Sequence, residues 1–355
     1  MEAVRFGIFD HVERTEVPLE QLYEDRLRLL QDADAAGVYG YHVAEHHATP
    51  LGMAPSPGIF LTAVAQRTRR IHIGPLVYLL PLYNPLRLVN EIAMLDQLSG
   101  GRFEIGVGRG VSPYELAYYR IPFYESREMF EDALAAVAGG LRNDRLTYHG
   151  RHYNFDAVPM EVRAHQRPNP PFWYGVSTPE SARFAAHHNL HFVGIGPHPM
   201  LKQLTMLYRE ERAATLAKGG DGGLNLNRHI SEPTIGAIRH VYVGADDREV
   251  AAIARPAYRA FYNNITKLWL DNRTSLPMFT PDLDIACKGD AAIAGTPSQV
   301  RDTVARFFAE SGCEYLVLAF AWGNLTEAQY RKSFDLFATQ VMPEFKDTRI
   351  TAAAD

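Results

Sequence analysis

Glu45, His46 and His47 stand next to one another and combine a carboxylate with two imidazoles. They follow Tyr41-His42-Val43, and we interpret residues 41–47 as a short strand that ends in this cluster. A histidine with a pKa near neutrality can take up and release protons at working pH. The cluster is therefore a candidate catalytic group, although the same side chains can also be solvated loop residues.

A metal site is the first alternative, because residues 42–46 match the H-x-x-E-H pattern of one class of zinc protease. That pattern needs a helix, where residues i and i+4 share a face. Gly37 and Gly40 before the segment and Pro50 after it favour a strand instead. Four residues of strand span roughly 13 Å, whereas zinc holds nitrogen ligands at about 2 Å. We expect no metal here.

A glycine-rich segment, Gly106-Val107-Gly108-Arg109-Gly110, resembles a dinucleotide turn. It lacks the third glycine, because position 111 is Val, and no acidic residue stands clearly at the ribose distance. We therefore expect no nicotinamide site. Two interpretations stay open: a strand end that needs small residues, or a strand end against which a flat ligand lies, with Arg109 supplying a positive charge.

A third candidate segment, residues 177–182, begins with Ser177 and Thr178 and precedes a predicted helix. Such residues are commonly N-caps, but the same turn presents N–H groups and hydroxyls to a phosphate. Phosphate sites of this kind occur in the loops at the carboxyl end of β/α barrels. Arg127, at the start of an earlier helix, is either a second phosphate contact or a surface arginine.

These segments are separated by alternating strands and helices. Apolar runs predict strands at residues 4–9, 41–47, 71–80, 102–108, 172–176, 192–195, 238–243 and 315–320. Helical spacing of apolar residues predicts helices between them. Eight such units indicate an α/β protein with a closed (β/α)8 TIM barrel, whose active site lies at the carboxyl ends of the strands.

We predict one TIM-barrel domain over residues 1–345 and a tail at 346–355. Residues 148–169 are predicted to form a hairpin or a long loop. Residues 262–291 fit neither periodicity and contain Pro277 and Pro281, so we interpret them as an insertion near the seventh strand–helix unit. With Trp269 and Phe279, this insertion is a candidate lid over the barrel mouth. His11, Tyr78 and Trp322 are expected to line that mouth.

Composition narrows the class of protein. The 355 residues carry a net charge of −5 and no long basic run, which argues against nucleic acid or an acidic membrane as the main partner. Two cysteines are too few for a disulfide framework and fit a reducing cytoplasm. We see no signal peptide and no apolar run near the ~20 residues that a spanning helix needs. The sequence therefore predicts a cytoplasmic protein.

Taken together, these segments resemble the bacterial luciferase-like flavin-dependent monooxygenase family. The resemblance covers residues 4–345 and rests on motifs that occur in family order. They are residues 44–47 (AEHH), 73–77 (IGPLV), 80–81 and 84–85, 95–102 (LDQLSGGR), 106–110 (GVGRG), 166–171 (QRPNPP), 177–182 (STPESA) and 295–297 (GTP). Each motif is weak alone, but the set is specific.

The resemblance implies a barrel that binds reduced FMN, reacts with O2 to a flavin hydroperoxide, and inserts one oxygen atom into a small organic substrate. His46 matches the family's essential histidine. The isoalloxazine contacts match Leu76, Val77, Gly108 and Val111. The family carries a cis peptide under the flavin ring, so we predict one between Leu76 and Val77. The phosphate contacts match Arg109, Arg127, Ser177, Thr178 and Ser181. Ser177 is a departure, because the best-known luciferase subunit has a carboxylate there.

The resemblance also implies a homodimer formed by the early helices. We expect a separate flavin reductase to supply reduced FMN, since no nicotinamide site is found. Two alternatives stay open: a deazaflavin-dependent oxidoreductase, because part of the superfamily transfers hydride with that cofactor, and a non-catalytic flavin-binding protein. The motifs do not define the substrate.

Overall fold

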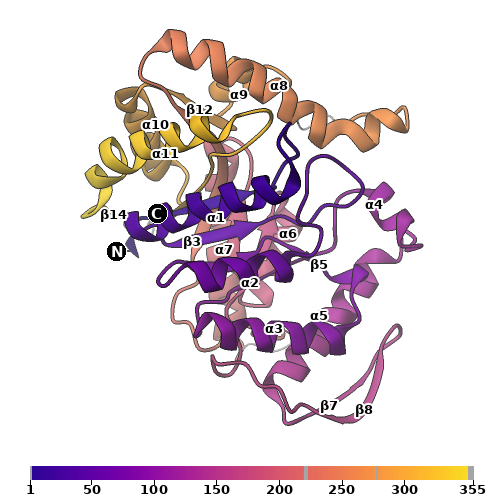
Figure 1. Ribbon diagram of the computed structural model, residues 1–355. Helices are drawn as coiled ribbons and strands as arrows, with labels where there is room; N and C mark the ends of the chain where they lie inside the picture. The colour runs from indigo at the N-terminus through magenta and orange to yellow at the C-terminus, as the bar shows by residue number, and fades with distance from the viewer. Residues whose placement is uncertain (1, 220–222, 277–278, 351–355) are drawn as a thin grey trace.

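The computed structural model describes residues 2–219, 223–276 and 279–350, and its centre is a nearly closed barrel of parallel strands (Figure 1). The barrel strands are β2 (Arg5–Asp10), β3 (Gly40–Val43), β4 (His72–Pro75) continued by β5 (Tyr78–Leu79), β6 (Ile105–Gly108), β9 (Phe172–Val176), β10 (His191–Gly194), β11 (Ile235–Val243) and β13 (Tyr315–Ala319). They follow the sheet order β4-β3-β2-β13-β11-β10-β9-β6-β5. The predicted α/β TIM barrel is confirmed.

Helices cover the outside of the barrel. They are α1 (Leu19–Ala36), α2 (Pro57–Arg67), α3 (Pro85–Ser99), α5 (Ser126–Arg142), α6 (Pro179–His187), α7 (His198–Ala217), α8 (Asp247–Asp271), α10 (Pro297–Glu310) and α11 (Glu327–Gln340). Local residues define their ends: the Asn84 side chain accepts a hydrogen bond from the Arg87 N–H before α3, and Gly100, with φ of 66°, ends it. In the described ranges, no helix is both long enough and apolar enough to cross a membrane.

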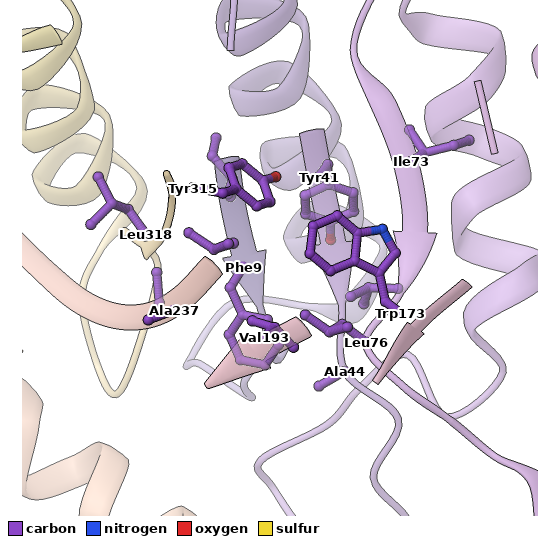
Figure 2. Close-up of a cluster of buried hydrophobic side chains, with 14 of the residues drawn as sticks. Phe9, Tyr41, Ala44, Ile73, Leu76, Trp173, Val193, Ala237, Tyr315 and Leu318 are labelled. Atoms are coloured by element: carbon purple, nitrogen blue, oxygen red, sulfur yellow. The ribbon is translucent and has the colours of Figure 1, made fainter. Parts of the chain in front are cut away.

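Buried side chains from all sides of the barrel fill its interior. Figure 2 draws a cluster of them, including Phe9, Tyr41, Ile73, Trp173, Val193, Ala237, Tyr315 and Leu318. The indole N–H of Trp173 donates to the Glu104 carboxylate at 2.5 Å, so the polar atom of the largest core side chain is satisfied. Among the described residues, the barrel interior is therefore a packed core.

The predicted strand at residues 71–80 is interrupted, and that part of the prediction was wrong. β4 ends at Pro75, the Leu76–Val77 peptide is cis as predicted, and β5 begins at Tyr78. The backbones are close here, because a Cβ on Gly74 would lie 2.1 Å from the Glu104 carbonyl oxygen and one on Gly106 would lie 2.1 Å from the Pro75 oxygen. Glycine is needed at both positions.

Some elements differ from the prediction. A six-residue helix, α4 (Pro113–Tyr118), follows β6, and an additional strand, β12 (Ala292–Gly295), pairs with β11. Neither was predicted. Residues 148–169 contain the second strand of a hairpin, β7 (Arg145–His149) and β8 (Asn154–Pro159), which confirms the hairpin interpretation.

The predicted insertion at 262–291 began too early. α8 continues to Asp271, because its buried residues Tyr258, Phe261 and Leu268 keep helical spacing. The shorter helix α9 (Leu283–Lys288) follows, and Pro277 lies outside the described residues. The last turns of α8 extend toward the side of the molecule that carries α4 (Figure 1).

The chain ends also differ from the predicted tail at 346–355. A 3-10 turn, η2 (Met342–Phe345), is followed by strand β14 (Arg349–Ile350). This strand pairs antiparallel with β1 (Glu2–Ala3). The Val4 N–H also donates to the Thr348 carbonyl at 3.2 Å. The fold therefore includes part of the predicted tail, whereas residues 351–355 lie outside the described chain.

Candidate functional site

A cavity of about 420 Å³ lies at the carboxyl ends of β3, β5, β6 and β9. It is lined by every site residue predicted from the sequence: His46, Leu76, Val77, Gly108, Arg109, Val111, Arg127, Ser177, Thr178 and Ser181. Val111 is at the rim, with 71% of its surface exposed. Barrel topology explains the assembly, because each segment follows a parallel strand and parallel strands end on the same side.

At one end of the cavity, a buried carboxylate holds His46. β3 ends at Val43, so His46 lies in the loop after the strand, and its Nδ1 is 3.1 Å from Oε1 of Glu115 on α4. The same oxygen accepts the His47 N–H at 3.0 Å. Burial raises the pKa of Glu115, but the His46 charge and these hydrogen bonds outweigh burial and hold it below its usual value.

An ionised Glu115 fixes the tautomer of His46, because a carboxylate accepts and Nδ1 must then carry the proton. Nε2 is left without this partner and can exchange a proton with a ligand. Glu115 was not predicted from the sequence. The signal available was Ser112-Pro113 followed by Glu115, which is typical of a helix start, and the Ser112 side chain does accept the Glu115 N–H at 3.3 Å.

A second pair braces the neighbouring loop. His47 Nε2 is 2.9 Å from Glu45 Oε1, and the other ring nitrogen contacts the Tyr119 hydroxyl at 2.8 Å. Glu45 Oε2 also accepts the Leu79 N–H and the Tyr83 hydroxyl, both at 3.0 Å. Burial raises the pKa of Glu45, although these hydrogen bonds oppose the rise. Glu45 therefore ties the histidine loop to β5, next to the cavity wall.

The opposite end of the cavity is the N-terminus of α6. Thr178 Oγ1 accepts the Ser181 N–H at 3.2 Å, and Ser181 Oγ accepts the N–H groups of Ser177 at 3.1 Å and Thr178 at 2.9 Å. This is a reciprocal capping box. The expected N-cap function is therefore present, and the hydroxyls face the same cavity.

Two arginines border this end. Arg127 Nη2 is 2.7 Å from the Glu180 carboxylate, in a pair whose side chains are 51% and 72% exposed. The Arg109 guanidinium lies over the Phe123 ring at 4.8 Å from its centre. Positive charge and a helix N-terminus thus meet at one end of the cavity, which is an arrangement that binds phosphate.

Between the two ends, the wall is apolar and contains two glycines with different roles. A Cβ on Gly108 would lie 2.4 Å from Val77 Cγ2, so this glycine permits close packing of the wall. A Cβ on Gly175 would meet nothing within 4 Å. Since Gly175 also lines the cavity, a side chain there would occupy the ligand space.

The expected mouth residues separate into two groups. The His11 ring lies 5.6 Å from the His46 ring, and Trp322 lies 5.8 Å from His240 in the same region. Tyr78 was wrongly expected there: its hydroxyl donates to Glu91 of α3 at 3.0 Å. Successive strand residues point to opposite faces, and Tyr78 has the outward direction.

The C-terminal part of α8 contacts the loops of the barrel mouth. The Thr49 hydroxyl donates to the Asn264 carbonyl at 3.2 Å, and the Asn264 amide donates to Glu13 at 2.8 Å. Trp269 lies 5.9 Å from the Tyr114 ring of α4. Among the described residues, no group of three or more His, Cys, Asp or Glu side chains is arranged to hold a metal ion.

Residues 4–315 match the family described as luciferase-like monooxygenase. The chain belongs to that family. The predicted enzyme class is thereby confirmed at the level of the family.

Relatives and solved structures agree with this membership. An uncharacterized Sinorhizobium fredii protein, y4wF, is 37% identical over 90% of this chain and 91% of its own length. The oxygenase component of the flavin-dependent trigonelline monooxygenase of Acinetobacter baylyi is 26% identical over 98% and 97%. The crystal structure of monooxygenase RslO1 from Streptomyces bottropensis matches with a TM-score of 0.82, 26% identity, and coverage of 96% and 99%.

Two more distant structures share the fold but differ in cofactor. The oxygenating constituent of 3,6-diketocamphane monooxygenase from Pseudomonas putida, solved with FMN, has a TM-score of 0.76 at 19% identity and covers 97% and 99%. An F420-dependent secondary alcohol dehydrogenase has a TM-score of 0.73 at 18% identity and covers 98% and 100%. The luciferase-like fold therefore accommodates both a flavin and a deazaflavin.

Proposed function

We propose that this protein is a flavin-dependent monooxygenase that binds reduced FMN in the cavity and uses O2 to oxygenate a small organic substrate. One observation carries the proposal: a single cavity joins an end formed by two arginines and a helix N-terminus, an apolar wall, and a carboxylate-held histidine. Reduced FMN, when bound, supplies the electrons that activate oxygen, and the protein must orient it and exclude water.

The α6 end fits a phosphate. The hydroxyls of Ser181 and Thr178 hydrogen-bond to each other and accept the N–H groups of Ser177, Thr178 and Ser181. An incoming phosphate can accept hydrogen bonds from these N–H groups and hydroxyls instead. Arg127 is held by the exposed Glu180, and an exposed pair of this kind contributes only about 0–1 kcal/mol. Arg127 can therefore turn to a dianionic phosphate, while Arg109 supplies a second charge.

The apolar wall fits the isoalloxazine ring. Leu76, Val77 and Gly108 form one stretch of the lining, and Gly175 leaves open space beside it. Ligand pockets of this type are mostly apolar and carry a few placed polar groups. FMN bound with its phosphate at α6 would place its ring along this wall, toward His46.

His46 is proposed to move the proton that the oxygen chemistry requires. Glu115 keeps the proton on Nδ1 and holds the ring by a buried contact, so that Nε2 is presented to ligands in one orientation. Glu45 and His47 brace the loop from the other side. We assign His46 as the catalytic residue and Glu115 as its positioning residue.

We also propose a separate flavin reductase and a homodimer. The reductase is supported by two similar proteins, of which one is the oxygenase component and the other the oxygenating constituent of a monooxygenase. The dimer is supported by exposed apolar side chains on neighbouring early helices: Ile59 on α2 is 77% exposed, and Met94 and Leu98 on α3 are 54% and 47% exposed. Sedimentation tests the dimer. We expect the wild type to sediment as a dimer and the Ile59→Glu variant as a monomer.

Rapid mixing tests the main proposal. The protein is loaded anaerobically with reduced FMN and then exposed to O2 while the absorbance of oxidised flavin is followed. We expect this absorbance to return much more slowly than with free reduced FMN, because the cavity excludes water. Gly175→Leu is the matched variant: it fills the ligand space, and its mixture should oxidise at the rate of free flavin.

Oxidation at the free-flavin rate in the wild type would contradict the proposal and favour the deazaflavin-dependent oxidoreductase. Titration with F420 then decides that alternative directly. Copurification of oxidised FMN that neither exchanges nor turns over would instead favour a flavin-binding protein without catalysis.

A further inference from the structure

Beyond His46, on the side away from α6, lies a group of buried rings that none of the proposed functions above uses. His11 follows β2, His240 lies in β11 opposite Ala319 of β13, Phe261 and Tyr258 come from α8, and Trp322 follows β13. We call these five residues the imidazole–aromatic cluster. All lie at the barrel end that carries the cavity, because His240 pairs with the last residue of β13.

The cluster is continuous with His46. The His11 ring is 5.6 Å from the His46 ring, and His11 stacks with His240 at 6.3 Å and 14°. Phe261 covers His240 at 4.0 Å, and Trp322 stands perpendicular to it at 5.8 Å. Phe9, which lines the cavity, meets His11 edge-on at 4.8 Å. Phe9 and His46 line the cavity, so the cluster lies directly behind two side chains of the cavity wall.

Both imidazoles are uncharged at neutral pH. Burial lowers the pKa of His240 to about 3. Burial, together with the neighbouring His46 and His240, lowers the pKa of His11 well below its usual value. The exposed fractions agree, at 7% for His11 and 8% for His240. A charged ligand group would find no compensating charge on these rings.

One polar atom in the cluster is fully buried and has no hydrogen-bond partner among the described residues. This atom is Nε2 of His240. The indole N–H of Trp322, next to it, is satisfied by the Val241 carbonyl at 3.1 Å. The His240 nitrogen is one of several buried side-chain nitrogens and oxygens without a partner in the described chain, and it is the one that lies in this cluster. Buried polar atoms are mostly paired in folded proteins, so this nitrogen is open to a hydrogen bond with a ligand or a bound water.

We propose that the imidazole–aromatic cluster binds the substrate, and that the substrate is an uncharged cyclic compound bearing a hydroxyl or carbonyl oxygen. That oxygen hydrogen-bonds to Nε2 of His240, and the ring packs against Phe261 and His11. His240 and His11 are then specificity-determining residues. They favour a ligand with an uncharged oxygen over a ligand with a charged group. This substrate site rests on the proposed function, which puts the reaction next to His46.

Calorimetry with small ring compounds tests this binding mode without turnover. The probes are 1-tetralone and 1-tetralol, which carry an uncharged oxygen, tetralin, which lacks it, and tetralin-1-carboxylate, which is charged. Flavin-free protein is used under nitrogen, so the measurement does not depend on oxygen chemistry. We expect the wild type to bind tetralone or tetralol about tenfold more tightly than tetralin, and the carboxylate at least about tenfold more weakly than either oxygenated probe.

His240→Phe keeps a flat ring and removes the nitrogen. It should bind tetralin as the wild type does and lose the preference for the oxygenated probes. His149→Phe is the control, because His149 is 59% exposed on the β7–β8 hairpin and should leave all four affinities unchanged. An oxygenated-probe preference that survives in His240→Phe overturns the proposal, and so does equal affinity for the carboxylate.

A second measurement covers the case in which His240→Phe does not fold. In wild-type protein with 15N-labelled histidine, tetralone or tetralol should shift the His240 Nε2 resonance, whereas tetralin should not. An unchanged Nε2 resonance at saturating tetralone and tetralol overturns the proposal. Failure of the proposed function is distinguishable, because it would abolish the delayed flavin oxidation and leave these binding results intact.

Discussion

The two ends of the cavity hold their charged groups in opposite ways. At the α6 end, Arg127 and Glu180 form a pair with side chains 51% and 72% exposed. At the histidine end, Glu115 is 3% exposed and contacts a His46 that is 21% exposed. Exposed pairs are weak and exchange partners easily, whereas a buried carboxylate is costly to leave unpaired. We infer that one end is built to capture an anion and the other to hold a single geometry.

Removing the imidazole should break the comparison most strongly. We expect His46→Ala to reduce turnover at least ~100-fold, because the group proposed to move the proton is gone. FMN binding should be nearly unchanged, since the proposed phosphate contacts lie at the other end. Stopped-flow turnover and flavin titration measure the two quantities separately. Unchanged turnover would remove His46 from the mechanism.

The positioning role of Glu115 predicts a smaller effect with a distinctive pH dependence. Glu115→Gln should lower kcat roughly 20-fold, because an amide no longer fixes Nδ1 as the protonated nitrogen. In the wild type the pKa of Glu115 is lowered, so the ionised contact is present at neutral pH and is lost as pH falls through that lowered value. Turnover should therefore drop on the acid side.

The acid-side drop should be absent in Glu115→Gln, and Glu115→Asp should recover part of kcat. Full pH profiles of kcat for the three proteins check both points. Equal profiles for the wild type and the glutamine variant would reduce Glu115 to a packing residue.

At the α6 end, Arg127→Ala should raise the Kd for FMN about fivefold and leave kcat at saturating flavin unchanged. Added salt should narrow the difference, because the contact is solvent-exposed. Arg151→Ala is the control, since Arg151 pairs with Glu128 on the hairpin side at 2.7 Å. A lower kcat with an unchanged Kd for FMN would mean that Arg127 acts in the reaction. It would contradict the inference that the α6 end serves to capture an anion.

The smallest effect should come from Glu180→Gln, and its direction is opposite. Glu180 competes with a phosphate for Arg127, so its neutralisation should lower the Kd for FMN about twofold to threefold. Helix α6 would lose an acidic first-turn residue, worth about 0.3–1 kcal/mol of stability. Fluorescence titration and thermal unfolding measure the two changes. Weaker FMN binding would mean that Glu180 contributes to the site.

The predicted site residues line one cavity because the barrel brings the ends of its strands together. His46, Gly108 and Ser177 are far apart in the chain, yet each lies at or just after the carboxyl end of a strand whose neighbours are parallel. Once eight strand–helix units are recognised, those positions must meet at one end. The ligand that they bind can be predicted from the family motifs, whereas strand periodicity gives no information about it.

Other residues could not be found in this way. Glu115 lies on α4, a helix of six residues that is too short for a periodic pattern. His240 lies inside β11, where a histidine among apolar residues has no distinguishing signal. The proposed role of His240 depends on a buried nitrogen without a hydrogen bond, which the sequence alone cannot show. The length of α8 was underestimated because two prolines downstream suggested irregular structure too early.

The pairing of β1 with β14 has a practical consequence. The two strands pair next to the start of β2, at the amino end of the barrel, and the cavity lies at the other end. A solid support that captures the protein near either strand would orient every molecule with its cavity facing the solution. An electrode or sensor surface prepared this way would present a uniform layer of accessible sites.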